Sequence, residues 1–185
     1  EGLHTQTGKP VSINGEDGKI VKVIPLRTLK GNQPEYYIAP GLIDNQVNGY
    51  AGVSFAFGGG ELTAEGIRKA TSGLWEKGVT TYLATLTTNS REVLLNNFEI
   101  LASMKNDPVL KGSLAGFHLE GPFISPVDGY RGAHPLQFVR EPDWNEFLDL
   151  YEAAGKNILT VTVAPETNGA MDFIRKCTQM GIIPA

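Results

Sequence analysis

The amino-acid sequence predicts an α/β protein built on a parallel β-sheet. From about residue 40 onward, short apolar runs alternate with amphipathic segments of helical period, and no helix-only or strand-only block interrupts them. This alternation is typical of strand–helix units whose strands pair in parallel. The chain has 185 residues, of which 41% are hydrophobic and 19% charged. It is therefore long enough to bury one substantial core.

Residues 1–39 have a different pattern and form a separate predicted domain. Residues 11–15 and 19–24 alternate apolar and polar side chains, and the stretch from Asn14-Gly15 to Gly18 favours a turn between two antiparallel strands. The run 36–38 is also β-prone and follows a turn signal at Gly31–Pro34. We predict a small antiparallel element here, with a second domain over residues 40–185.

The second domain is expected to contain four strand–helix units and the start of a fifth strand. Helix caps and stops define the helices, because Ser, Thr and Asp satisfy the first free N–H groups and Gly ends a helix readily. The expected strands cover residues 42–47, 79–83, 112–119 and 158–163, and a fifth strand starts at Gly181. Three of the expected helices begin after Thr63, Ser90 and Asp143, and the fourth covers residues 168–180.

The third of these helices has the clearest signal. Asp143 and Glu146 have the spacing of a capping box, and Gly155 ends the helix. An apolar stripe at positions i, i+3, i+4 and i+7 predicts core packing rather than function. A closed (β/α)₈ barrel needs about 200 residues at minimum. The residues alone thus predict either a smaller open sheet or part of a longer protein.

Composition excludes several functional classes. The net charge of -4 gives no basic surface for nucleic acid. No apolar run approaches the roughly 20 residues that cross a bilayer, and the first residues lack the features of a signal peptide. We therefore expect a cytoplasmic protein without membrane or nucleic-acid partners. The single cysteine, Cys177, is predicted to be a buried, inert thiol on a helix.

Polar residues at the expected strand ends are the candidates for chemistry. Glu120 ends the apolar run 114–119, and Gly121-Pro122 then breaks the strand. In a parallel sheet this places a carboxylate at the edge where α/β enzymes keep their active sites. A buried carboxylate must be paired, hydrogen-bonded or bound to metal. Glu120 is therefore either functional or part of a structural ion pair or cap.

Other polar groups are expected near Glu120. Gln46 and Asn48 share a face of the first strand, where they either bind metal weakly or tie down a loop. His118 shares the face of Glu120 and is expected either to orient its neighbours or to be a hydrogen-bonded core residue, rather than a ligand. The hydroxyl-rich stretch 85–88 and His134, in a loop, add further polar groups. His4 is expected near a frayed terminus, and the glycine-rich loop 57–60 lacks the pattern of a phosphate-binding loop.

The motifs together resemble a known family. Pro40-Gly41-Leu42-Ile43-Asp44 with Gln46-Val47-Asn48-Gly49 is similar to the first-strand signature of N-acetylglucosamine-6-phosphate deacetylases, in the amidohydrolase superfamily. His118-Leu119-Glu120-Gly121-Pro122-Phe123 resembles the third-strand motif of that family. Gly132-Ala133-His134-Pro135 resembles its substrate-contacting loop, and Ala164-Pro165-Glu166 its fourth-strand end.

The resemblance implies a fold and an activity. The fold is a metal-dependent (β/α)₈ TIM-type barrel with a small β-domain, of which residues 1–39 supply the N-terminal share and residues 40–185 the first half of the barrel. The activity is hydrolysis of the acetamide of N-acetylglucosamine 6-phosphate to glucosamine 6-phosphate and acetate. Family members are usually homodimers.

The same resemblance assigns roles to individual residues. Glu120 would be a ligand of a divalent metal ion, commonly zinc, that activates water. Gln46 and Asn48 stand where related enzymes have a His-x-His pair, which favours one metal over two. Ala133, through its backbone, and His134 would bind the sugar.

The family's two metal-binding histidines and its catalytic aspartate, the general base, would follow Ala185. The chain is thus interpreted as an N-terminal fragment that contains no catalytic residue and is inactive alone. Two alternatives stay open. One is another amidohydrolase, similar to dihydroorotase or allantoinase, although these use His-x-His and a lysine bridge. The other is a non-catalytic half-barrel that binds a sugar phosphate.

Overall fold

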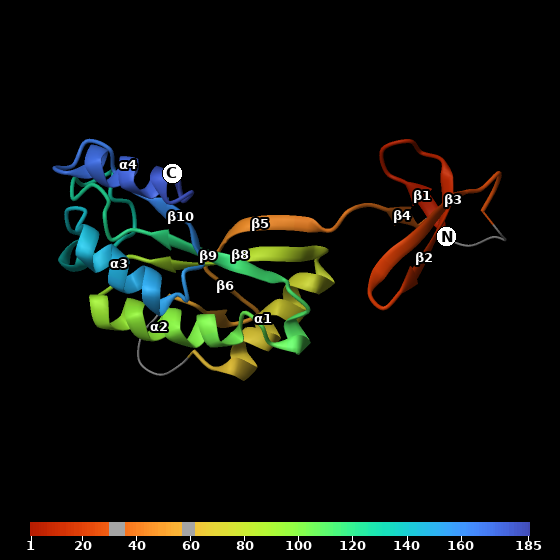
Figure 1. Cartoon of the computed structure of the whole chain (residues 1–185), viewed down its shortest axis with the longest axis horizontal. Coiled ribbons are helices and arrows are strands. Elements are labelled where there is room, and N and C mark those ends of the chain that lie inside the picture. Colours follow the sequence, from red (N-terminus) through yellow and green to blue (C-terminus); the bar gives the residue numbers. More distant parts are fainter. Residues whose placement is uncertain (30–35, 57–61) are drawn as a thin grey trace. The chain divides into compact units, whose positions relative to one another are not determined.

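The computed structural model describes residues 1–29, 36–56 and 62–185. The chain divides into two compact units, Glu1–Gly41 and Leu42–Ala185, each with its own β-sheet (Figure 1). The predicted turn at Gly31–Pro34 and the glycine-rich loop 57–60 lie outside the described residues.

The first unit is a four-stranded sheet in the order β3-β2-β1-β4. Its strands are β1 (Gly2–His4), β2 (Pro10–Glu16), β3 (Lys19–Pro25) and β4 (Tyr37–Ile38). β2 and β3 form the predicted antiparallel hairpin, and its turn lies at Asp17-Gly18, at the end of the stretch 14–18 that favoured a turn. Both turn residues have positive φ, 49° and 73°, as a tight two-residue hairpin turn requires. Asn14 and Gly15 instead mark a shift in strand register.

Two expectations for this unit were wrong. The sheet is mixed rather than purely antiparallel, because β1 pairs with β4 in parallel. His4 belongs to β1 and is not frayed, since its backbone N–H donates to the carbonyl of Lys9 at 2.9 Å. Pairing with β2 and β4 on both sides holds this terminal segment in place.

The second unit contains the predicted parallel sheet. Its strands are β5 (Leu42–Val47), β8 (Val79–Thr87), β9 (Leu114–Glu120), β10 (Ile158–Thr162) and β11 (Ile183–Pro184), in the order β11-β10-β9-β8-β5. Every neighbouring pair is parallel. All five strands therefore end at the same edge of the sheet, where the candidate residues follow them.

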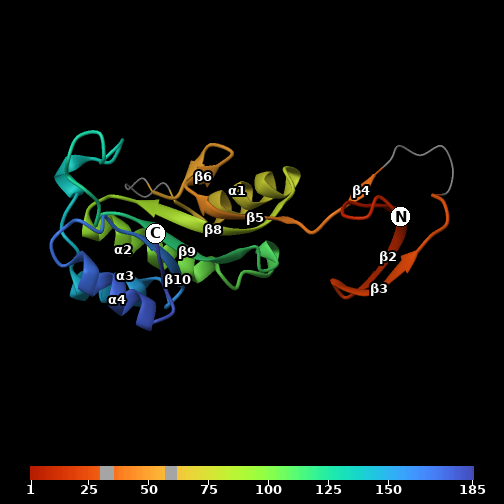
Figure 2. The same ribbon diagram turned by 90° about the horizontal axis from the view of Figure 1, so that it is seen from above.

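Four helices accompany the sheet: α1 (Ala64–Glu76), α2 (Arg91–Met104), α3 (Trp144–Ala153) and α4 (Ala170–Gln179) (Figures 1 and 2). The predicted caps are present, because Thr63 Oγ1 accepts from the Gly66 N–H at 3.0 Å and Ser90 Oγ from the Val93 N–H at 3.4 Å. Three short elements were not predicted: the hairpin β6–β7 (Gly49–Tyr50 and Val53–Ser54) and the 3₁₀ turns η1 (Pro108–Leu110) and η2 (Leu136–Phe138).

The capping box predicted for α3 is only half formed. Asp143 Oδ1 accepts from the N–H groups of Asn145 and Glu146 at 2.8 and 3.0 Å. The Glu146 carboxylate does not reach back to Asp143 but accepts from the guanidinium of Arg140 at 2.9 Å through Nε. A charged partner outcompetes a backbone N–H for this carboxylate.

The sheet buries one face against the helices. Alternate residues of β8 and β9, among them Tyr82, Leu86 and Phe117, belong to a core shared with α1 to α4 and have no exposed surface. Cys177 of α4 lies in the same core, so the prediction of a buried thiol is confirmed, and burial raises its pKa to about 11. No helix in the described parts of the chain has the length and apolarity to cross a membrane.

Candidate functional site at the strand ends

The opposite face of the sheet carries polar groups near the strand ends. Thr87, Glu120 and Thr162 are register partners on three adjacent strands, so their side chains lie on one face at one level. Two residues earlier, Thr85 and His118 form the next level on the same face. The alternation that buries Phe117 against the helices therefore directs His118 and Glu120 away from them.

Glu120 is the centre of the site. Its Oε2 accepts from the Nδ2 of Asn48, which follows β5, at 3.2 Å. Its Oε1 lies 3.8 Å from the Nε2 of His134, which belongs to the loop after β9. Glu120 and His134 each retain 19% side-chain exposure. The carboxylate is thus partly shielded, held from two sides, and still open to a ligand.

His134 is positioned by its own loop and by the end of β8. Its Nδ1 lies 2.9 Å from the hydroxyl oxygen of Thr88. The guanidinium of Arg131 donates to the His134 carbonyl at 2.8 Å and also contacts Asp128. These contacts fix a loop residue that sequence spacing alone would leave free.

His118 lies beneath this cluster and is almost fully buried. Its Nε2 is 2.8 Å from the hydroxyl of Thr162 on β10, while its buried Nδ1 has no hydrogen-bond partner among the described residues. Burial lowers the pKa of His118, although the Glu120 carboxylate and the backbone of Asn45 act in the opposite direction. A neutral imidazole here can orient the strand ends without adding charge.

The structure separates the two amides predicted to act together. Asn48 contacts Glu120, whereas no hydrogen bond links the Gln46 side chain to Glu120 within the part of the chain that is described. Instead, the Gln46 backbone N–H donates to Asp44 Oδ1 at 3.0 Å. The strand β5 ends at Val47, so Asn48 leaves the strand and can turn toward β9.

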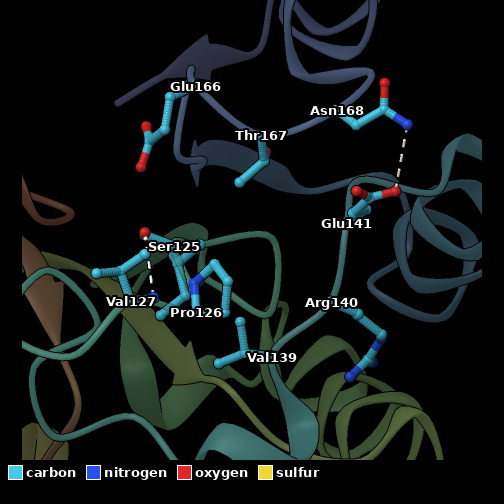
Figure 3. A pocket seen from close by; sticks show the side chains of 10 residues that line it. Ser125, Pro126, Val127, Val139, Arg140, Glu141, Glu166, Thr167 and Asn168 are labelled. Atoms are coloured by element: carbon cyan, nitrogen blue, oxygen red, sulfur yellow. Dashed lines mark hydrogen bonds between the residues drawn. The ribbon is translucent and has the colours of Figure 1, made fainter.

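Two cavities adjoin this edge of the sheet. One, of about 440 Å³, is lined by residues 87–89 and by loop residues that include both predicted sugar contacts, Ala133 and His134. The other, of about 490 Å³, lies between the loops after β9 and β10 (Figure 3). It is lined by Glu166 and by Glu141, whose carboxylate accepts from Asn168 at 3.4 Å. In the part of the chain that the structure describes, no hydrogen bond or ion pair joins either carboxylate to Asn48, Glu120 or His134.

The donor atoms around Glu120 suit part of a divalent metal site. A carboxylate oxygen is an ordinary ligand of zinc and similar ions. Among the described residues, however, no group of three or more His, Cys, Asp or Glu side chains could hold a metal ion. The cluster thus fits as a contributor to a metal site rather than as a whole one.

Sequence reasoning assigned no role to three residues that shape the site. Thr88 belongs to the hydroxyl-rich strand end, which was the only signal available for it. Arg131 braces the loop at His134. Arg140 donates to Glu146 and, at 3.2 Å, to the carbonyl of Asn89, which ties the end of this loop to α3 and to the segment after β8. Arginines inside a Gly- and Pro-containing loop are the pattern that could have indicated such braces.

Known proteins resemble this chain over most of its length. N-acetylglucosamine-6-phosphate deacetylase from Mus musculus is 37% identical over 147 residues, which cover 78% of this chain and 35% of that protein. The protein of the same name from Bacillus subtilis (strain 168) is 32% identical over 183 residues, which cover 94% of this chain and 44% of that protein. No family model matches the chain.

Solved structures give the same result. The D267A mutant of N-acetyl-D-glucosamine-6-phosphate deacetylase from Mycobacterium smegmatis, in complex with N-acetyl-D-glucosamine-6-phosphate, has a TM-score of 0.74 and 28% sequence identity; the match covers 90% of this chain and 42% of that one. The chain thus spans less than half the length of the relatives it matches. Its parallel sheet with α1 to α4 is a half-barrel preceded by a separate small sheet, and the resemblance to N-acetylglucosamine-6-phosphate deacetylases is confirmed.

Proposed function

We propose that this chain is part of an enzyme that hydrolyses the acetamide of N-acetylglucosamine 6-phosphate, giving glucosamine 6-phosphate and acetate. The observation that carries the proposal is the convergence of Asn48, Glu120 and His134 from three separate elements at the end of a half-barrel. The relatives named above, at 32–37% identity, support this choice of substrate and reaction. They do not support the alternative of a dihydroorotase-like or allantoinase-like enzyme.

In this proposal, Glu120 holds a divalent metal ion, for which zinc is the first candidate. When bound, such an ion lowers the pKa of a water molecule and polarises an amide carbonyl. Asn48 orients the Glu120 carboxylate through its hydrogen bond. Gln46 is a further candidate for holding water near the strand ends. His118, which contacts the Thr162 hydroxyl, would help to orient the residues around Glu120.

The sugar would lie on the loop side of Glu120. Ala133 and His134 line the cavity of about 440 Å³ beside residues 87–89, which gives a ligand access to both of them. The imidazole of His134 and the backbone of Ala133 offer hydrogen bonds to sugar oxygens. The general base and further metal ligands are expected outside these 185 residues, and we propose that the chain alone is inactive.

The proposal extends to the assembly and location of the protein. We propose that residues 1–39 are the N-terminal share of a small β-domain and that residues 40–185 form the first half of an amidohydrolase barrel. We further propose a cytoplasmic homodimer that acts on a small amino-sugar phosphate, without nucleic-acid or membrane partners.

The decisive test compares Glu120, the last residue of β9, with Glu166, which follows β10. In the protein as its gene encodes it, Glu120→Gln should lower acetate release from N-acetylglucosamine 6-phosphate by a factor of about 1,000 or more and weaken zinc binding. Glu166→Gln, at the exposed edge of the second cavity, should leave both within about threefold. An unmodified protein that releases no acetate from this substrate would refute the proposed activity.

A non-catalytic sugar-phosphate-binding half-barrel is the second candidate. The finding that favours it is that the described residues provide no group of three metal-binding side chains. Calorimetry of residues 1–185 with N-acetylglucosamine 6-phosphate, without metal, would distinguish the two. Binding in the micromolar range would support a binding module, and its absence would support the enzyme.

A further inference from the structure

We propose that Thr88 is a positioning residue that fixes both the direction and the tautomer of His134. This inference deepens the proposed function and depends on it for the identity of the ligand. Thr88 follows β8 and is 2% exposed. Its hydroxyl oxygen lies 2.9 Å from the Nδ1 of His134. A buried, short side chain thereby holds one nitrogen of an imidazole whose other nitrogen faces Glu120.

The direction of the hydrogen bond follows from counting protons. A threonine hydroxyl has one proton to donate, and buried hydroxyls rarely leave it unused. Within the described residues, His134 Nδ1 is the one hydrogen-bond partner of Thr88 Oγ1. Thr88 therefore donates and Nδ1 accepts, so a neutral His134 carries its proton on Nε2.

The position of Glu120 supports the same tautomer independently. Nε2 lies 3.8 Å from Glu120 Oε1. An ionised carboxylate can only accept hydrogen bonds, so an N–H that faces it is attracted, while a nitrogen lone pair is repelled. Both neighbours of the ring thus favour the proton on Nε2, and neither favours it on Nδ1.

Gly121 provides the space in which the Thr88 hydroxyl lies. It follows Glu120 directly and has a φ of +82°. A Cβ at this position would lie 2.1 Å from Thr88 Oγ1, far inside contact distance. The backbone at the end of β9 therefore closes over the hydroxyl. The same backbone segment, Glu120-Gly121, thus positions the Glu120 carboxylate and restricts the position of the Thr88 hydroxyl that contacts His134.

The consequence is that His134 offers an N–H donor to the site. A ligand there would be recognised through an acceptor oxygen, such as a carbonyl or a sugar hydroxyl, rather than through a donor group. Without the Thr88 hydroxyl, the ring could rotate or exchange tautomers, and the donor would face the ligand for only part of the time.

The test measures the tautomer directly by long-range ¹H–¹⁵N NMR on the ¹⁵N-labelled protein as its gene encodes it, at about pH 8.5, where an ordinary imidazole is neutral. The His134 signals are assigned by their loss in His134→Gln. We expect a pyrrole-type shift at Nε2 and a pyridine-type shift at Nδ1. The reverse pattern in the unmodified protein would overturn the proposal without any variant.

Three variants test the role of the hydroxyl. Thr88→Val keeps the shape of the side chain and should give a mixture of tautomers, whereas Thr88→Ser should retain the original pattern. Thr80→Val, an exposed position at the start of the same strand, is the matched control and should change nothing. Unchanged His134 shifts in a folded Thr88→Val protein would overturn the proposal. If Thr88→Val does not fold, the unmodified protein and Thr88→Ser still decide it.

Kinetics separate this inference from the proposed function. For N-acetylglucosamine 6-phosphate, kcat/KM should fall about 10- to 100-fold in Thr88→Val and recover to within about threefold in Thr88→Ser. An inactive unmodified protein that shows the expected tautomer would refute the function and leave the inference intact. Full activity in Thr88→Val with an unchanged tautomer would refute the inference about Thr88 and leave the proposed function intact.

Discussion

On one face of the parallel sheet, toward α1 to α4, the strand side chains are apolar and shielded from water. On the other face, hydroxyl, imidazole and carboxylate groups lie beside exposed aliphatic side chains such as Ile43 and Leu159. Period-two alternation produces both faces from the same strands. One face thus supplies the packing that stabilises the fold. The other face is free to carry polar and charged groups, which a packed apolar core would exclude.

The largest expected effect is a loss of stability from the covered face. Phe117 is fully buried, with its ring centroid 5.7 Å from that of Phe98. Phe117→Ala should lower the free energy of unfolding by about 3–5 kcal/mol, because it removes apolar contacts and leaves a cavity. Urea denaturation of this chain measures the change.

Leu159→Ala is the matched control on the other face. Leu159 is 42% exposed, so its loss should cost less than about 1 kcal/mol. If both substitutions lowered the free energy of unfolding equally, the two faces of the sheet would be packed alike, which would contradict the proposed difference between them.

The next largest effect concerns the chemical reactivity of Cys177. Burial raises the pKa of this thiol from 9.0 to about 11. At pH 8 the thiolate fraction is therefore about 100-fold lower than in an unfolded chain, before steric shielding is added. Alkylation by iodoacetamide should be slower by at least this factor in the folded chain, and a rate near that of urea-unfolded protein would contradict the burial.

The same shift gives stability a defined pH dependence. Below the unfolded pKa of 9.0 the thiol is protonated in both the folded and the unfolded state, so its ionisation does not lower the free energy of unfolding. As the pH rises from 9.0 to about 11, the thiol of the unfolded chain loses its proton first, which favours the unfolded state. The free energy of unfolding therefore decreases over this pH range. Cys177→Ala should remove this contribution to the alkaline decline in urea-denaturation experiments, while the decline from the buried Tyr82, whose pKa is also raised by burial, should remain.

A smaller effect is expected on the polar face of the sheet, where Leu159 packs closely over Gly116. A Cβ at Gly116 would lie 2.7 Å from Leu159 Cδ1 and 2.9 Å from the carbonyl oxygen of Asn157. Gly116→Ala should cost about 1–3 kcal/mol in unfolding free energy. Adding Leu159→Ala should recover part of this loss, since the side chain can be removed but the Asn157 backbone cannot. A fully additive double mutant would show that the predicted crowding is absent.

The smallest effect is predicted for Ile43, which is 77% exposed on β5. Ile43→Thr keeps the branched side chain that suits a strand, so the unfolding free energy should change by less than about 0.5 kcal/mol. Self-association of the chain should nonetheless decrease, because the substitution removes apolar surface next to an open strand edge. Sedimentation velocity at several concentrations tests this, and a loss of stability above 2 kcal/mol would show that Ile43 is packed.

The sequence by itself determined the architecture of the second unit. The predicted strand 42–47 is strand β5, and the caps Thr63, Ser90 and Asp143 begin the helices that they predicted. These features are local, since a cap or an alternation acts within a few residues. The first-strand motif at residues 40–49, combined with the motif around Glu120, was also sufficient to identify the family that the chain resembles.

Only the tertiary structure decided which polar groups meet. Asn48 and Gln46 have similar side chains two residues apart, yet among the described residues the hydrogen bond to Glu120 comes from Asn48, which lies just beyond the end of β5. Glu146 has the spacing of a cap partner but binds Arg140, which spacing within the helix could not show. Thr88 and His134 are 46 residues apart and meet because β8 and β9 are neighbours in the sheet. Local patterns specify elements, whereas contacts between distant residues depend on strand order and loop paths, which single residues do not encode.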